Sequence, residues 1–329
     1  MNRRPRRNRK GAHIRKMVEE THLDVSILIY PLFVTAGNKI KQEVSSLPGN
    51  FVFSANELLK EIKSCVELGL TNFILFPKVP GDLKDKSGTY GYSKKNFYLD
   101  VAKQVKSSFP EVVLVSDVAL DPYNSDGHDG IVRDGEIIND ETLEILVRMA
   151  ILQADAGYDI IGPSDMMDGR VGAIRKGLDD NGFTNTSIMS YTAKYASAFY
   201  GPFRDALDSA PVTDSAIPGD KKTYQMNPAN KREALIEAHL DTAEGADFLM
   251  VKPAIHYLDV IHSLHMNSHL PIAAYHVSGE CAQLIAACQN GWLTYEEAMP
   301  EALLSIRRAG ADAILTYFAK DFARLSQNK

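Results

Sequence analysis

Hydrophobic residues gather along the chain in eight short runs of five to eight residues. The runs are rich in β-branched and aromatic residues, and they are continuous rather than alternating, which is typical of parallel strands buried on both faces. The predicted strands cover residues 27–34, 72–77, 112–116, 158–162, 187–191, 247–251, 271–275 and 313–317.

Segments with helical spacing of apolar residues lie between most of these runs, at 56–68, 139–156, 233–243 and 296–309. Several end in a glycine, which suits the left-handed backbone at a helix C-terminus, and a strand follows directly. A joint of the form Gly-x-Asp recurs at 157–159, 245–247 and 310–312. Eight such units predict a (β/α)8 barrel. A doubly wound sheet is the alternative, but no glycine-rich fingerprint follows the first strands.

Two lysines stand at the ends of apolar runs, Lys194 after 187–191 and Lys252 after 247–251. Barrel enzymes carry their chemistry at the C-terminal ends of the strands, so we expect the two lysines on one rim. Crowded, buried lysines lose a proton more easily and become nucleophiles toward ketones and aldehydes. The alternative is that each ammonium simply reaches solvent. Polar residues that follow other runs are expected at the same rim: Asp117, Asp165, Ser278 and Tyr317.

Composition indicates an ordinary globular protein, with 45% hydrophobic residues, 24% charged residues and a net charge of −6. No apolar run approaches the length of a membrane helix, and the N-terminus lacks the apolar core of a secretory signal. Three cysteines without CxxC spacing argue against a disulfide framework and a cysteine-rich zinc site. We therefore expect a cytoplasmic protein without a membrane partner.

The first sixteen residues are strongly basic, and residues 1–22 are interpreted as an arm before a catalytic barrel at 23–329. Such an arm either stays solvated or packs on a neighbouring subunit. Nucleic-acid binding is the alternative, and the acidic remainder and the lack of interleaved aromatic residues disfavour it. The basic residues are Arg3, Arg4, Arg6, Arg7, Arg9, Lys10, Arg15 and Lys16.

The longest connection, at about 200–227, shows little helical periodicity and is predicted to be an active-site lid. It would bring Arg204, Lys221 and Lys222 over the two lysines, where cations suit a substrate that bears a carboxylate. A solvated surface loop is the alternative.

Two further groups of residues are weighed as metal sites. His262, His265 and His269 are expected on the surface of an outer helix. Glu233, Glu237 and Asp241 form one carboxylate stripe, either a solvated helix face or a source of oxygen ligands for a hard cation. No serine-hydrolase elbow, P-loop or zincin motif occurs.

Four motifs resemble the porphobilinogen synthase (5-aminolevulinate dehydratase) family: 190–194 (Ser-Tyr-Thr-Ala-Lys), 199–205 (Phe-Tyr-Gly-Pro-Phe-Arg-Asp), 250–254 (Met-Val-Lys-Pro-Ala) and 275–280 (Tyr-His-Val-Ser-Gly-Glu). The resemblance runs from residues 30–34 to 316–317. It implies condensation of two 5-aminolevulinate molecules to porphobilinogen with loss of water, in tetrapyrrole biosynthesis and without an organic cofactor. It also implies a homo-octamer in which the arm embraces a neighbour.

The resemblance assigns roles to individual residues. Lys252 is expected to form a Schiff base with the first substrate and Lys194 to engage the second, while Asp117 is a candidate for positioning an amine or moving protons. The first substrate is expected to contact Ser278 and Tyr317, and the second Arg204, Lys221 and Gln225, while Tyr275 is expected to bind substrate. Many relatives have arginine at position 221, and a lysine there lacks the bidentate grip on a carboxylate.

The metal expectation rests on a departure from the zinc-using members, which carry three cysteines after the third strand. The corresponding positions are Ala119, Asp121 and Asp129, so no thiolate cage forms, and Asp126 replaces a frequent histidine. Two carboxylates favour Mg2+ over Zn2+, or bind no metal. Glu237 matches the allosteric magnesium ligand of the family.

These residues therefore predict an enzyme that Mg2+ stimulates through Glu237 and that needs no zinc. Two functional alternatives remain at this level. A class I Schiff-base aldolase would need a single lysine, and a nucleic-acid-binding protein would use the basic arm.

Overall fold

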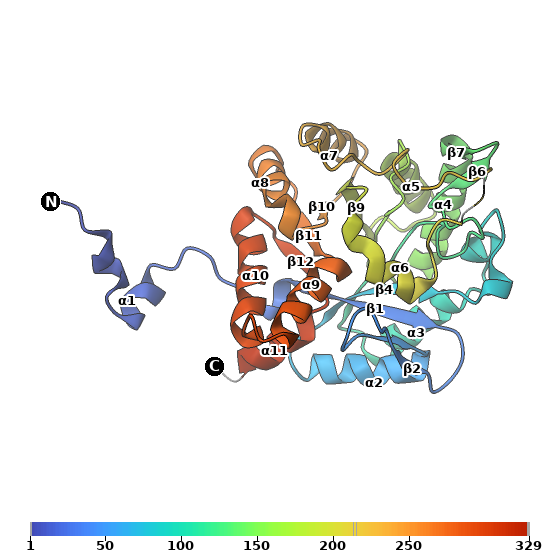
Figure 1. The fold of residues 1–329 in the computed structure, drawn as a ribbon. Helices are drawn as coiled ribbons and strands as arrows, with labels where there is room; N and C mark the ends of the chain where they lie inside the picture. Colours follow the sequence, from blue (N-terminus) through green and yellow to red (C-terminus); the bar gives the residue numbers. More distant parts are fainter. Residues whose placement is uncertain (1, 213, 215, 328–329) are drawn as a thin grey trace.

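Residues 2–212, 214 and 216–327 are described by the structure, a computed structural model. Within this part of the chain, eight parallel strands close into a barrel in the order β1, β4, β5, β8, β9, β10, β11 and β12, and β12 pairs with β1. Helices surround the strands (Figure 1). The predicted (β/α)8 barrel is confirmed.

The barrel strands lie within two residues of most predicted runs. They are β1 (Leu28–Thr35), β4 (Asn72–Lys78), β5 (Val113–Val115), β8 (Ile160–Ile161), β9 (Ser187–Lys194), β10 (Phe248–Lys252), β11 (Ile272–His276) and β12 (Ala313–Thr316). The surrounding helices are α2 (Ala55–Val66), α3 (Phe97–Ser108), α4 (Asn139–Asp155), α5 (Arg170–Asp180), α7 (Glu233–Ala243), α8 (Leu258–Asn267), α9 (Ser278–Gln289), α10 (Tyr295–Ala309) and α11 (Ala319–Gln327).

Shorter elements decorate this frame. Strands β2 (Lys41–Glu43) and β3 (Phe51–Phe53) extend the sheet beside β1, and β6 (Ile131–Arg133) and β7 (Glu136–Ile138) form a separate hairpin. Single turns of 3₁₀ helix are η2 (Val25–Ile27), η3 (Gly81–Leu83), η4 (Thr89–Tyr92), η5 (Ala198–Tyr200) and η6 (Ile255–Tyr257). Among the described residues, no helix combines the length and the apolar character that a membrane crossing requires.

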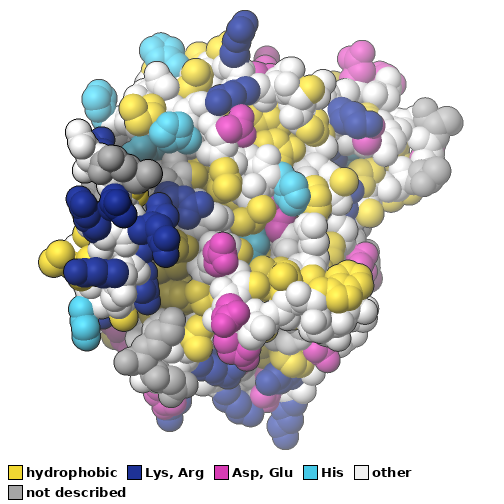
Figure 2. Space-filling view, turned by 60° about the vertical axis from the view of Figure 1, so that its left-hand side comes forward, with side chains coloured by type: hydrophobic (Ala, Val, Ile, Leu, Met, Phe, Trp, Pro, Cys, Tyr) yellow, Lys and Arg dark blue, Asp and Glu magenta, His cyan; other side chains and the backbone are white. Residues whose placement is uncertain are grey.

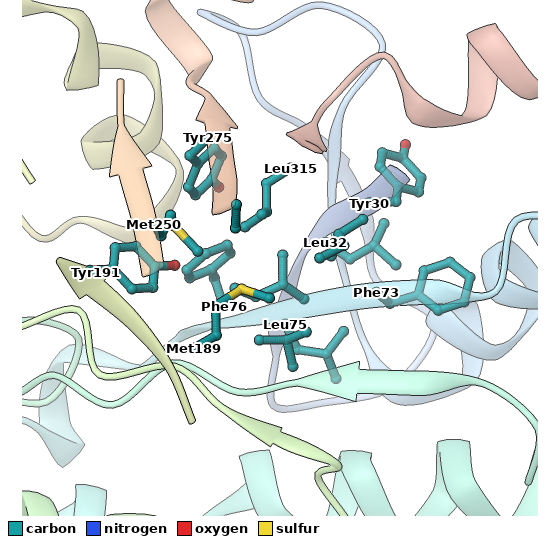
Figure 3. Packing of buried hydrophobic residues seen from close by; sticks show 14 of the residues in the cluster. Tyr30, Leu32, Phe73, Leu75, Phe76, Met189, Tyr191, Met250, Tyr275 and Leu315 are labelled. Atoms are coloured by element: carbon teal, nitrogen blue, oxygen red, sulfur yellow. The ribbon is translucent and has the colours of Figure 1, made fainter. Parts of the chain in front are cut away.

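Side chains from the strands fill the barrel interior (Figure 3). Phe76 of β4, Tyr191 of β9 and Tyr275 of β11 lie close together there and are buried. Nearly every residue of β1 and β9 is buried, which explains the continuous apolar runs. The packed interior places polar chemistry at the ends of the strands rather than inside the barrel.

The recurrent Gly-x-Asp joint has a structural role at the N-terminal end of the barrel. The aspartate that precedes each strand accepts a backbone N–H from the strand before it: Asp159 from Leu114 (2.8 Å), Asp247 from Ile188 (2.8 Å) and Asp312 from Ile272 (3.0 Å). In return, each aspartate donates its own N–H to the carbonyl of the same partner. These joints therefore hold neighbouring strands together at the face opposite the strand ends that carry the lysines.

The N-terminal arm contains a 3₁₀ turn, η1 (Pro5–Arg9), and a short helix, α1 (Ala12–Met17), which project away from the barrel (Figure 1). Neither element has a buried residue. Figure 2 shows Lys and Arg side chains gathered on one side of the molecule, and the arm's basic residues are all exposed.

The predicted lid differs from the expected loop at its start. It begins with η5 and a helix, α6 (Gly201–Leu207), in which Pro202 occupies the first turn and Ala206 and Leu207 are buried. A helix of seven residues is too short to show a periodicity in the sequence. The rest of the connection is irregular, and its residues 213 and 215 lie outside the described part.

Candidate active site

Lys194 and Lys252 face each other across neighbouring strands, since β9 and β10 pair in a register that sets Lys252 opposite Lys194. Both residues are buried, with exposed fractions of 6% and 5%. Two ammonium groups brought together in this way disfavour each other's charge. The sequence placed both lysines on one rim, and the structure places them side by side.

Four aromatic rings surround the Lys252 amine. Its Nζ atom lies 5.0 Å from the ring centre of Tyr191, 5.3 Å from Tyr200, 5.0 Å from Phe203 and 4.6 Å from Tyr275. Such rings exclude water, yet their faces attract a cation. They therefore permit a neutral amine and also stabilise a positive charge that forms on it.

Burial, and then the charge of Lys194, lower the pKa of Lys252 to about 7. An ordinary lysine has a pKa of about 10.4 and is almost fully protonated at neutral pH. Lys252 thus presents a free amine in a substantial fraction of molecules at neutral pH, as a nucleophile toward a carbonyl requires.

Lys194 has a different environment from Lys252. Its Nζ atom donates to Asp129 Oδ2 at 3.3 Å and to the backbone carbonyl of Ser164. These two partners fix the direction of the Lys194 amine. The two lysines are therefore suited to two different tasks.

Lys221 comes from the lid and bridges two carboxylates of the loop after β5. Its Nζ atom lies 3.2 Å from Asp121 Oδ2 and 2.8 Å from Asp129 Oδ1. Burial raises the pKa of Asp129, but Lys194 and Lys221 outweigh burial and hold this pKa below its usual range. Burial lowers the pKa of Lys221, and the two carboxylates more than restore it.

The two carboxylates do not fit a divalent cation in this arrangement, because lysine ammonium groups already hold Asp121 and Asp129. Across the described residues, no group of three or more His, Cys, Asp and Glu side chains is arranged to hold a metal ion. His262 and His265 lie on the outer helix α8, and His269 follows it.

Asp117 lies two residues beyond the end of β5 and is buried. Burial, and then the charge of Asp121, raise the pKa of Asp117 to about 7. Its Oδ1 atom has no hydrogen-bond partner among the described residues. Tyr98 accepts the backbone N–H of Asp117 at 3.1 Å, and Gln153 donates to its carbonyl at 3.0 Å. A fixed carboxyl that titrates near neutrality is suited to proton transfer.

Three hydroxyl groups lie at the ends of β11 and β12. The Tyr275 and Tyr317 oxygens are 3.0 Å apart, and Ser278 Oγ accepts the backbone N–H of Phe203 in the lid helix at 3.0 Å. Hydroxyl donors of this kind suit a substrate carboxylate. The contact between Ser278 and Phe203 also ties the lid to this part of the rim.

The lid closes over a small cavity of about 30 Å³. One water needs about 10–15 Å³ of such space, so the cavity admits water but no substrate until the lid moves. The Gln225 Oε1 atom is buried without a hydrogen-bond partner in the described part of the chain. The lining residues are Asp121, Lys194, Tyr200, Phe203, Arg204, Lys221, Gln225 and Lys252.

One expectation about this rim is wrong. Lys222 does not reach the lysines, because its side chain is 72% exposed and pairs with Asp220 at 2.6 Å. Asp165 follows β8 as expected, is fully buried and lies 4.0 Å from Arg170.

Several lid contacts were not predicted from the sequence. Lys78 of β4 pairs with Asp208 Oδ2 at 3.1 Å, and Lys84 donates to the Asp208 carbonyl at 2.9 Å. His128 lies 2.8 Å from the Pro218 carbonyl, and the Asp126 carbonyl accepts an N–H from Val212. These partners are distant in the chain, and no motif marks them. The aromatic residues around Lys252 did carry a signal, because they lie within the motifs at 190–194, 199–205 and 275–280.

A second cavity, of about 620 Å³, lies between the β6–β7 hairpin, the end of the lid and α7. Burial raises the pKa of Glu237 to about 7, since the attraction of Arg170 does not offset it and Asp241, Asp168 and Glu233 add to it. Glu237, Glu233 and Asp168 are among the residues that line this cavity. Proteins often hold a hydrated hard cation with one or two carboxylates. Gln225 lines both cavities.

The sequence and the fold were compared with known proteins. The delta-aminolevulinic acid dehydratase family matches residues 2–325. The delta-aminolevulinic acid dehydratase of Chlamydia pneumoniae is 54% identical over 319 residues, covering 97% of this chain and 95% of the relative. That of Bradyrhizobium diazoefficiens is 49% identical over 316 residues, covering 96% of this chain and 88% of the relative.

A solved structure agrees with these relatives. The delta-aminolevulinic acid dehydratase of Toxoplasma gondii, in complex with its reaction product porphobilinogen, superposes with a TM-score of 0.96 at 49% identity. The match covers 98% of this chain and 91% of that one. The resemblance of the four motifs is thus confirmed over the full length, and the chain belongs to the delta-aminolevulinic acid dehydratase (porphobilinogen synthase) family.

Proposed function

We propose that this protein condenses two 5-aminolevulinate molecules to porphobilinogen, a step in tetrapyrrole biosynthesis, through Schiff bases on Lys252 and Lys194. One observation carries the proposal: two buried lysines lie side by side under a lid, one among aromatic rings and the other paired with a carboxylate. Two amines in different surroundings would hold two substrates at once, and this arrangement supports a condensation of two ketones over the single-lysine chemistry of an aldolase.

The first step uses the free amine of Lys252. It attacks the ketone carbon of the first substrate, and the carbinolamine loses water to leave a protonated imine. The four rings around Nζ stabilise this positive charge. The imine acidifies the adjacent carbon, and Asp117, whose pKa is about 7, is suited to accept the proton that leaves.

The second substrate binds at Lys194. It forms an imine there in the same way, with loss of a second water. The deprotonated carbon of one substrate attacks the imine carbon of the other, and elimination then releases the lysine from that carbon. The free amino group of the substrate that was attacked adds to the remaining imine carbon, which releases the other lysine and closes the ring, and loss of a proton gives the aromatic pyrrole. Holding both substrates in one small cavity removes much of the entropic barrier to their reaction. The closed lid excludes bulk water while the imines exist.

The carboxylates of the two substrates differ in their partners. Ser278, Tyr275 and Tyr317 supply hydroxyl groups for the first. Arg204, Lys221 and Gln225 approach from the lid and serve the second. Lys221 also neutralises Asp121 and Asp129, so its charge supports the site before substrate arrives.

We further propose that Mg2+ stimulates the enzyme through Glu237 and that the protein works without zinc. The raised pKa of Glu237 and the amide and carboxylate groups of its cavity support this site. A cation bound there would place positive charge in a cavity that Gln225 lines, and Gln225 also lines the active-site cavity.

The proposed assembly is a homo-octamer in the cytoplasm. An exposed arm without a buried residue supports a role in holding a neighbouring subunit. The three free cysteines suit a reducing compartment.

The deciding experiment is turnover of 5-aminolevulinate, measured with a colour reagent specific for the pyrrole product. Lys252→Ala is expected to abolish turnover and Lys194→Ala to lower it about 1,000-fold or more, whereas Lys176→Ala, on the exposed side of α5, retains it. A wild-type protein that forms no porphobilinogen would overturn the proposal. A Lys194→Ala variant with full activity would point to a single-lysine aldolase.

A further inference from the structure

Glu280 lies in the first turn of α9, where no role has been assigned to it. Its side chain is 1% exposed, and its carboxylate lies between two loops that carry proposed substrate-binding residues. One loop follows Lys252 at the end of β10, and the other follows β11 and leads to Ser278. A buried carboxylate is costly unless its oxygens are well satisfied, so its partners are informative.

The Oε1 atom of Glu280 faces the first loop. It accepts the backbone N–H of Ile255 at 2.8 Å and that of His256 at 3.3 Å, and it lies 3.1 Å from His256 Nδ1. Because an ionised carboxylate only accepts hydrogen bonds, His256 donates from Nδ1. Ile255 is three residues after Lys252.

The Oε2 atom joins the same loop to the second one. It accepts the N–H of Val277 at 3.0 Å and that of Ala254 at 3.3 Å. Val277 immediately precedes Ser278, and Ala254 is two residues beyond Lys252. One charged group therefore holds the ends of β10 and β11 together by five hydrogen bonds.

The same cluster reaches the lid. The His256 ring stacks on Phe199, with ring centres 4.2 Å apart and planes at 20°. Phe199 stands two residues before the lid helix α6. A displacement of the Glu280 carboxylate would therefore move the backbone beside Lys252 and Ser278, and through His256 it would also move the start of the lid.

We propose that Glu280 is a positioning residue, which fixes the Lys252 amine and the Ser278 hydroxyl relative to each other by binding the backbone of both loops. This inference rests on the proposed roles of Lys252 and Ser278. Hydrogen bonds from N–H groups to a carboxylate are among the stronger ones in proteins, and small misplacements of reacting groups have large kinetic effects.

The test is Glu280→Gln, which keeps the shape but places an NH2 group against the N–H donors of one loop. We expect kcat/KM for 5-aminolevulinate to fall about 100-fold, with a higher KM and slower reductive trapping of Lys252 in folded protein. The matched control is Asp312→Asn, which alters a carboxylate that binds β11 at the opposite end of the barrel. It is expected to lower thermal stability while kcat/KM stays within about threefold of the wild type.

A second variant decides the matter if Glu280→Gln does not fold. Val277→Pro removes one N–H donor, and the Val277 φ of −76° suits proline. It is expected to raise KM about tenfold, more than it lowers kcat. Unchanged KM in Val277→Pro, or a Glu280→Gln kcat/KM within about threefold of Asp312→Asn, would overturn the inference. A wild type without turnover would instead overturn the proposed function.

Discussion

The expected reactivity of each lysine amine depends on its immediate neighbours, because the two residues are of the same type. Lys252 lies among four rings without a carboxylate at hydrogen-bond distance in the described residues, and Lys194 is fixed by Asp129. The rings lower the cost of a neutral amine and also stabilise a cationic imine. The same residue type therefore serves two functions in one cavity.

The lowered pKa of Lys252 predicts how its reactivity depends on pH. The free amine is the nucleophile, so adduct formation should be small below about pH 6 and rise through a midpoint near the pKa of about 7. Reductive trapping of 5-aminolevulinate on Lys252 with cyanoborohydride, followed by peptide mapping, measures this curve. A midpoint above about pH 9, as for an ordinary lysine, would contradict the prediction.

At the level of elements, the lid helix and α9 approach each other closely at one point. A Cβ atom on Gly279 would lie 2.4 Å from the Phe199 carbonyl oxygen, and Ser278 accepts the Phe203 N–H. Closure of the lid therefore requires a glycine beside the serine. Gly279 lies between Ser278, which contacts the lid helix, and Glu280, which binds the loops after β10 and β11.

Gly279→Ala is expected to push the start of the lid away from α9. The reason is the backbone contact at Phe199, which cannot rotate away as a side chain would. We expect kcat/KM to fall about tenfold or more and the loop at 208–227 to become more sensitive to limited proteolysis. Gly201→Ala in the lid helix is the control, because nothing lies within 4 Å of its added Cβ. Equal kinetics for the two variants would refute the steric argument.

At the level of the whole molecule, the cavity that contains Glu237 links the metal response to pH. Because the pKa of Glu237 is raised to about 7, protons compete with a cation there, and the competition strengthens as the pH falls. The Mg2+ concentration for half-maximal stimulation should therefore rise between pH 8 and pH 6. Glu237→Gln should remove the response, while Glu297→Gln on α10 should retain it. Activity restored only by zinc after chelation would contradict the magnesium proposal.

The N-terminal arm is expected to affect the assembly of the whole protein. Because η1 and α1 contain no buried residue, these short helices need another surface for stability. Deleting residues 2–17 is expected to lower the oligomer size seen by light scattering and to reduce activity most at low protein concentration. Unchanged size and activity would show that the arm has no part in assembly.

The sequence by itself determined the barrel and the pair of lysines. Strands of a closed parallel barrel are buried on both faces, so they appear as continuous apolar runs, and their C-terminal ends must meet at one rim. Lys194 and Lys252 could be placed together from these two rules alone. The motifs then indicated the family, because the proposed site residues lie in short stretches of sequence at the ends of β9, β10 and β11 and in the lid helix.

Only the tertiary structure decided which side chains complete the site. Lys222 turns to solvent while Lys221 turns inward, and no local pattern separates two adjacent lysines in an irregular loop. Glu280 binds residues 24 to 26 positions away, and Asp208 pairs with Lys78 across the fold. Such contacts depend on side-chain direction and on loops closing over long separations. A one-dimensional pattern does not specify these quantities, and packing of the complete barrel fixes them.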